Sequence, residues 1–164
     1  KSYPNLFNLA AFFGPGGYVI PPEKYSYAYE YFGPILDSLK QFSDKYESVF
    51  RTTSLIIRGY ADATTVRKGS SLYKKLCSYL DKENAEREEL NLALSTLRSE
   101  EISKVLATIL KQKAPGFKSI SKIIFETIEA GYGEKLPSHT ISDYKTDDER
   151  RRIVMIFWSV LPNE

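Results

Sequence analysis

Near the middle of the chain stands the stretch Thr53-Ser-Leu-Ile-Ile-Arg-Gly-Tyr-Ala-Asp62. Its β-branched and apolar residues end at Gly59, a pattern that predicts a buried strand over residues 53–59. Asp62 follows three residues after this glycine. The sequence therefore predicts one carboxylate just beyond the end of a buried strand.

A long amphipathic helix is the clearest pattern downstream, because apolar residues recur at helical spacing from Leu90 to Leu110. Arg98 lies on this helix, so Asp62 and Arg98 can face the same edge of the sheet, where α/β folds often bind ligands. An arginine binds a carboxylate through two parallel hydrogen bonds, and an aspartate binds an ammonium group. The pair therefore suits a small zwitterion. The alternative is that Asp62 caps a turn and Arg98 forms a surface ion pair.

The remaining patterns predict an α/β (α+β) sandwich of βαβαβ type, in which helices pack on a small mixed sheet. Residues 1–22 are expected to form an arm leading into a short strand. Further elements are expected as follows: a helix over 23–46 that breaks and restarts at Pro34, an additional helix over 72–80, and strands over 120–130 and 152–161. We divide the chain into an arm (1–15) and one domain (16–164) with an insertion at about 64–89.

The composition of the chain disfavours several classes of function. The 164 residues carry 23 basic and 21 acidic side chains, and this near balance disfavours nucleic acid as a partner. The only cysteine, Cys77, and the only histidine, His139, lack neighbours at metal-ligand spacing, so we expect no metal, no cofactor and no nucleophile triad, and hence no enzyme. No apolar run is long enough to span a bilayer, so any membrane contact is expected through a segment absent from this chain.

Two motifs near the C-terminus have ordinary structural interpretations. Gly131-Tyr-Gly-Glu134 is expected to form a tight turn after a strand, with glycines supplying positive backbone angles, rather than a phosphate loop. Arg150-Arg-Arg152 precedes a strand, where neighbouring side chains alternate between faces. At most one or two of these arginines can therefore serve a single site, and a solvated strand entrance is the other interpretation.

Taken together, these segments resemble the OmpA-like domains, the family of the C-terminal domains of OmpA, Pal and MotB. The resemblance rests on Gly59-Tyr-Ala-Asp62 beside the family's Gly-His-Thr-Asp, and on Asn91-Leu-Ala-Leu-Ser-Thr-Leu-Arg98-Ser99 beside Asn-x-x-Leu-Ser-x-x-Arg-Ala. It also rests on Gly131-Tyr-Gly-Glu-Lys-Leu-Pro137 and Arg150-Arg-Arg-Ile153, the latter beside Asn-Arg-Arg-Val. Tyr60, Ala61 and Arg150 depart from the family pattern, and the segment from Asp62 to Asn91 is longer than usual.

The resemblance implies non-covalent binding of peptidoglycan, with Asp62 and Arg98 holding the amino and carboxylate groups of diaminopimelate in the stem peptide. Asn91 and Leu94 are carried over with the helix motif, and Arg151 is a lesser candidate. It further implies a periplasmic domain that anchors a membrane protein or complex to the cell wall. We expect both side chains in an accessible hollow, so that replacing either by alanine leaves stability within about 1 kcal/mol.

A different class of function is a module for dimerisation or protein interaction on the same fold, with weak or no peptidoglycan binding. The insertion and the aromatic segment Tyr25-Ser-Tyr-Ala-Tyr-Glu-Tyr31 would then form a homodimer contact or dock a partner in a stator-like membrane complex.

Overall fold

The computed structural model describes residues 13 and 15–163, and the backbone alone of residues 5–8. Its strands and helices follow one another as β1 (Asn5–Asn8), α1 (Tyr25–Asp44), β2 (Arg51–Gly59), α2 (Ser71–Leu80), α3 (Arg87–Lys113), β3 (Ile123–Gly131) and β4 (Ile153–Pro162). Short 3-10 turns lie at Pro22–Lys24, Ala114–Gly116, Ile120–Lys122 and Glu149–Arg151.

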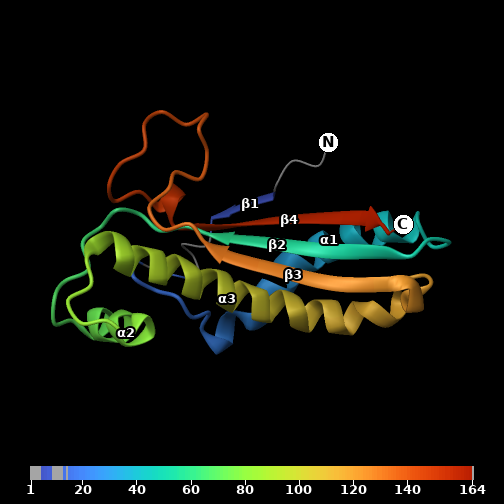
Figure 1. Ribbon diagram of the computed structural model, residues 1–164, viewed down its shortest axis with the longest axis horizontal. Coiled ribbons are helices and arrows are strands. Elements are labelled where there is room, and N and C mark those ends of the chain that lie inside the picture. The colour runs from blue at the N-terminus through green and yellow to red at the C-terminus, as the bar shows by residue number, and fades with distance from the viewer. Residues whose placement is uncertain (1–4, 9–12, 14, 164) are drawn as a thin grey trace.

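The strands form one mixed sheet in the order β1-β4-β2-β3 (Figure 1). β2 and β3 are parallel and are joined through the helices, whereas β4 runs antiparallel to both β2 and β1. The expected fold class, a small mixed sheet with helices packed on it, is therefore confirmed.

Helices α1 and α3 cover one face of the sheet, and the main core lies between them and the strands (Figure 1). Phe32 and Leu36 of α1 and Leu106 of α3 meet Leu55 and Ile57 of β2, and all five are buried. Alternate residues of β2 point to this face, as a half-covered strand requires. The helix that the insertion was predicted to contain is present as α2, which packs on the first half of α3 through buried Leu76.

Some expected boundaries are wrong. Pro34 lies inside a continuous α1 and does not restart the helix, because Phe32 and Ile35 on either side are both buried in the core. That packing offsets the hydrogen bond that a proline removes from a helix. The short strand of the N-terminal region is Asn5–Asn8, whereas residues 18–20 form no strand. Residues 9–12, part of the expected arm, lie outside the described residues.

Candidate functional site

Asp62 lies just past the end of β2 and is nearly enclosed, with 6% of its surface exposed. The chain leaves the strand along the sheet end, since Tyr60 N donates to Ile153 O and Ala61 N to Gly133 O, each at 2.9 Å. The Asp62 carboxylate then accepts a hydrogen bond from its own loop, from Thr64 N at 3.0 Å. This Asx-type turn fixes the carboxylate at the edge of the sheet.

Helix α3 crosses the ends of β2 and β3 at very short range. A Cβ added to Gly59 would lie 2.1 Å from Ser95 O, and one added to Gly131 would lie 2.2 Å from Thr96 Oγ1. Ser95 Oγ accepts a hydrogen bond from Gly133 N at 2.8 Å, which joins the helix to the turn after β3. The two strand-end glycines therefore permit the approach that brings this stretch of α3 against Asp62.

The expected turn after β3 is present, but its glycines differ in role. Gly133 has φ +60°, the positive angle that was expected. Gly131 is the last residue of β3, and a glycine is needed there because a Cβ would collide with Thr96 of α3. Glu134 completes the turn, and its carboxylate accepts hydrogen bonds from Arg87 and Asn91 of α3.

Arg98 is completely buried and is held by backbone carbonyls. Its Nε donates to Gly17 O at 2.9 Å and its Nη1 to Tyr60 O at 3.2 Å, while its guanidinium lies 6.0 Å from the ring centre of Phe13. The third nitrogen, Nη2, is buried without a hydrogen-bond partner. Burial lowers the pKa of Arg98 to about 10, against the opposing attraction of Asp62 and with a smaller repulsion from Arg152.

A pocket of about 190 Å³ joins these residues. Its walls come from the arm, from the insertion, and from the region of β2 and α3. The lining residues are Pro15 and Gly16, then Thr64, Thr65, Val66, Arg67, Ser70 and Leu72, and finally Asp62, Asn91, Leu94 and Arg98. Four of the five predicted site residues thus line one pocket, and the insertion forms one of its walls.

Asn91 and Leu94 connect the segments that form the walls of the pocket. Asn91 Nδ2 donates to Thr64 O at 3.0 Å and to Glu134 Oε2 at 2.7 Å, which ties the insertion and the β3 turn to α3. Leu94 is buried in the apolar cluster that includes Leu76 of α2. Their side chains therefore shape the walls of the pocket.

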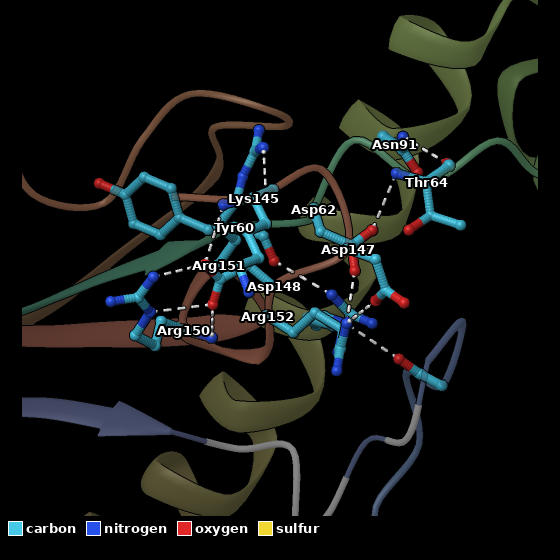
Figure 2. Close-up of polar contacts among 12 residues, drawn as sticks. Tyr60, Asp62, Thr64, Asn91, Lys145, Asp147, Asp148, Arg150, Arg151 and Arg152 are labelled. Carbon is cyan, nitrogen blue, oxygen red and sulfur yellow. Dashed lines mark hydrogen bonds and ion pairs between the residues drawn. The ribbon is translucent and has the colours of Figure 1, made fainter. Parts of the chain in front are cut away.

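Arg151, the fifth candidate, does not line the pocket, and Arg152 lies beside Asp62 in its place (Figure 2). Arg152 Nη1 donates to Asp62 Oδ2 at 2.5 Å and to Asp147 Oδ1 at 2.8 Å. Arg151 instead donates to the carbonyls of Lys145 and Glu134. All three arginines precede β4, so strand alternation does not apply to them, and Arg152 follows directly after the 3-10 turn Glu149–Arg151.

Burial alone would lower the pKa of Arg152, but its hydrogen bonds and attraction to Asp62 and Asp147 outweigh burial and raise it. Arg152 therefore stays charged beside Asp62. Arg150 lies outside this pair and binds Asp148 and Asp143 at the surface of the same loop.

The expectation of an accessible pair is wrong, because Asp62 is 6% exposed and Arg98 is completely buried. The expectation that loss of Arg98 is nearly neutral for stability is wrong as well. Its guanidinium has no exposed surface. It donates hydrogen bonds to Gly17, 81 residues away in the sequence, and to Tyr60, 38 residues away. Removing it leaves the carbonyls of Gly17 and Tyr60 without this partner, and for the buried Tyr60 carbonyl an unsatisfied group costs roughly 1–3 kcal/mol.

Other candidate features fall outside the pocket. Cys77 is a partly exposed free thiol, and among residues 13 and 15–163 we find no group of three or more metal-ligating side chains. No helix in the described part of the chain is both long and apolar enough to cross a membrane.

Comparison with known proteins gave matches among solved structures only, because no family model and no curated protein matches the chain. The peptidoglycan-associated lipoprotein from Burkholderia pseudomallei is similar over 90% of this chain and 87% of that one, with 15% identity and a TM-score of 0.42. The periplasmic domain of MotB is similar over 93% of this chain and 59% of that one, with 16% identity and a TM-score of 0.44. Both belong to the OmpA-like group that the sequence resembles. At these scores the likeness carries no argument about the function of this chain.

Proposed function

We propose that this chain binds peptidoglycan non-covalently through the pocket between α3, the insertion and the arm, and so anchors a membrane protein or complex to the cell wall. The ligand is the free amino-acid end of diaminopimelate in the stem peptide. Its carboxylate binds Arg98 and its ammonium group binds Asp62. No covalent step is involved.

One observation carries this proposal: the unpartnered Nη2 of Arg98, in a guanidinium that lines a pocket together with a carboxylate. Arg51 provides the contrast, because it is equally buried. All three of its nitrogens have partners, since it donates to Ser43 Oγ, Val49 O and Lys118 O at 2.7–3.1 Å. A buried donor without a partner costs free energy that a ligand carboxylate can recover.

Binding replaces contacts that the chain makes with itself. Gly17 O occupies one nitrogen of Arg98, and Arg152 occupies one oxygen of Asp62. Because Arg98 has no exposed surface, a neighbour must shift before a ligand reaches Nη2, and we assign this shift to the arm at Pro15–Gly17. Arg152 keeps a partner when Asp62 is shared, since it also binds Asp147.

The test is co-sedimentation with purified peptidoglycan sacculi, comparing Asp62→Asn with Asp148→Asn. Both carboxylates are buried beside an arginine, but only Asp62 lines the pocket. We expect wild type and Asp148→Asn to pellet with sacculi and Asp62→Asn to stay in solution, with circular dichroism confirming that both variants fold. Pelleting of folded Asp62→Asn at the wild-type level would refute the role of this pocket.

The interaction module remains the alternative, and the exposed tyrosines of α1 favour it. Tyr25, Tyr27, Tyr29 and Tyr31 have 36%, 57%, 36% and 40% of their surface exposed. The insertion packs on α3 through buried Leu76. Light scattering of wild type and Tyr27→Ser separates the candidates: a dimer that the substitution dissociates, together with no binding to sacculi, would favour the alternative.

A further inference from the structure

Arg67 is an unpaired charge at the rim of the pocket. It is exposed and lines the pocket, and its guanidinium has no hydrogen bond or ion pair within the described part of the chain. It comes from the insertion, three residues before Ser70, the residue that caps α2. Since Arg98 lies buried and Arg67 lies exposed, the pocket has one guanidinium at its floor and one at its rim.

The start of α2 adds to this positive character. Ser70 and Leu72 line the pocket, and the first turn of α2 contains no acidic residue. Backbone N–H groups at a helix N-terminus favour anions, and although the Ser70 side chain accepts from Tyr73 N, no carboxylate of that turn offsets the others. The second observation that points to an anionic ligand is the buried, unpartnered Nη2 of Arg98 in the same pocket.

The charges in the pocket do not balance. Asp62, Arg67 and Arg98 are the charged residues that line it, and Asp62 is already paired with Arg152. Two guanidinium groups therefore face a ligand whose ammonium group has only a shared carboxylate to bind. This set matches a ligand with two carboxylates and one ammonium group.

We infer that Arg67 is a specificity-determining residue that binds a second carboxylate, so that the pocket selects stem peptides ending at diaminopimelate. This inference rests on the proposed function. The side-chain end of diaminopimelate reaches Asp62 and Arg98 at the floor, and the carboxylate of its peptide-chain end stays at the rim beside Arg67. Amidation of that carboxylate, or its linkage to a further residue, removes the charge that Arg67 binds.

The experiment measures the dissociation constants of two synthetic peptides by isothermal titration calorimetry. One is L-Ala-γ-D-Glu-meso-diaminopimelate, and the other carries an amide at the peptide-chain carboxylate of diaminopimelate. We expect wild type to prefer the free acid about tenfold, as for the loss of one charge-assisted contact. Arg67→Gln should bind the amide as wild type does and lose the preference.

Lys68→Gln is the matched control. Lys68 is adjacent, exposed and of the same charge, but it lines a different hollow together with Tyr73 and Asn84. This variant should keep the tenfold preference. If wild type binds both peptides equally, or if Lys68→Gln loses the preference as Arg67→Gln does, the role of Arg67 is refuted while the proposed function stands. If wild type binds neither peptide nor sacculi, the proposed function fails as well.

Discussion

Substituting Gly59 by alanine tests whether the close approach of α3 to the strand ends builds the site. The new Cβ would lie 2.1 Å from Ser95 O, whereas ordinary contacts begin at about 3.4 Å. The helix must therefore retreat by 3.4 − 2.1, or about 1.3 Å, unless the strand distorts. The obstacle is backbone, with further backbone atoms of Ser95 and Ser99 at 3.1 and 3.2 Å, so no side-chain rotation relieves it.

Overpacking of this kind costs about 3 kcal/mol, the upper part of the usual range, because α3 is also held by the main core. For a domain of this size each kcal/mol lowers the melting temperature by about 2–4 °C, so we expect a decrease of about 6–12 °C. Differential scanning calorimetry measures it. The displaced helix also moves Arg98 away from Asp62, so binding to sacculi should weaken at temperatures where the variant is still folded.

Gly33→Ala is the control, since apart from its chain neighbours and the backbone of its own helix no atom lies within 4 Å of a Cβ at that position in α1. Alanine within a helix is favoured over glycine by up to about 1 kcal/mol, but Pro34 disfavours a helical backbone in a preceding residue that has a Cβ, so this variant should melt close to the wild-type temperature. A Gly59→Ala protein that melts within 2 °C of wild type would refute the reasoning, because α3 would then not be held at the distance that the structure shows.

Two further predictions concern buried charges. Arg98→Gln and Arg51→Gln should both lower the denaturant midpoint in urea, because each removes hydrogen bonds of a buried guanidinium to backbone carbonyls. Only Arg98→Gln should lose binding to sacculi under conditions where both are folded, and equal binding by the two variants would contradict the assignment of Arg98. Hydrogen bonds from Arg150 and the backbone hold the pKa of Asp148 far below its usual value, so the stability it contributes is present above about pH 4 and is lost as the pH falls below that. Asp148→Asn should therefore be less stable than wild type at pH 7, with the difference narrowing at pH 3, and a difference that stays constant or widens would contradict this sign.

Much of the site followed from local patterns. The buried strand ending at Gly59 and the apolar stripe of the long helix were sufficient to place Asp62 and Arg98 at one end of the sheet. Asn91 and Leu94 were carried over from the resemblance to the family motif, and they line the same pocket as Arg98 because residues three, four and seven apart share a helix face. The inserted helix was also predictable, since Leu72, Leu76 and Leu80 recur at helical spacing in a polar segment.

What could not be predicted depends on contacts between distant segments. Arg98 is buried because the arm reaches it through Gly17, 81 residues away, and no local pattern signals that hydrogen bond. Whether Arg151 or Arg152 lies beside Asp62 depends on where β4 begins. Strand boundaries predicted from sequence are uncertain by several residues, whereas a shift of one residue already turns a side chain to the opposite face. The pairing of Arg152 with Asp62 had a weak signal in the sequence, because one or two arginines of the run 150–152 were expected to be able to serve a single site.

The contacts that the chain makes with itself also determine which end of a zwitterion contributes most to binding. Because its pKa is about 10, the charged form of Arg98 is roughly a thousand times more populated than the neutral form at pH 7. A ligand carboxylate that replaces Gly17 O exchanges a neutral acceptor for a charged one, and such hydrogen bonds are about twice as strong. A ligand ammonium group at Asp62 gains less, because it shares a carboxylate that Arg152 already neutralises. In the proposed binding mode the ligand carboxylate at Arg98 therefore makes the stronger of the two contacts, and the ammonium group at Asp62 supplies the remainder that binding to sacculi requires.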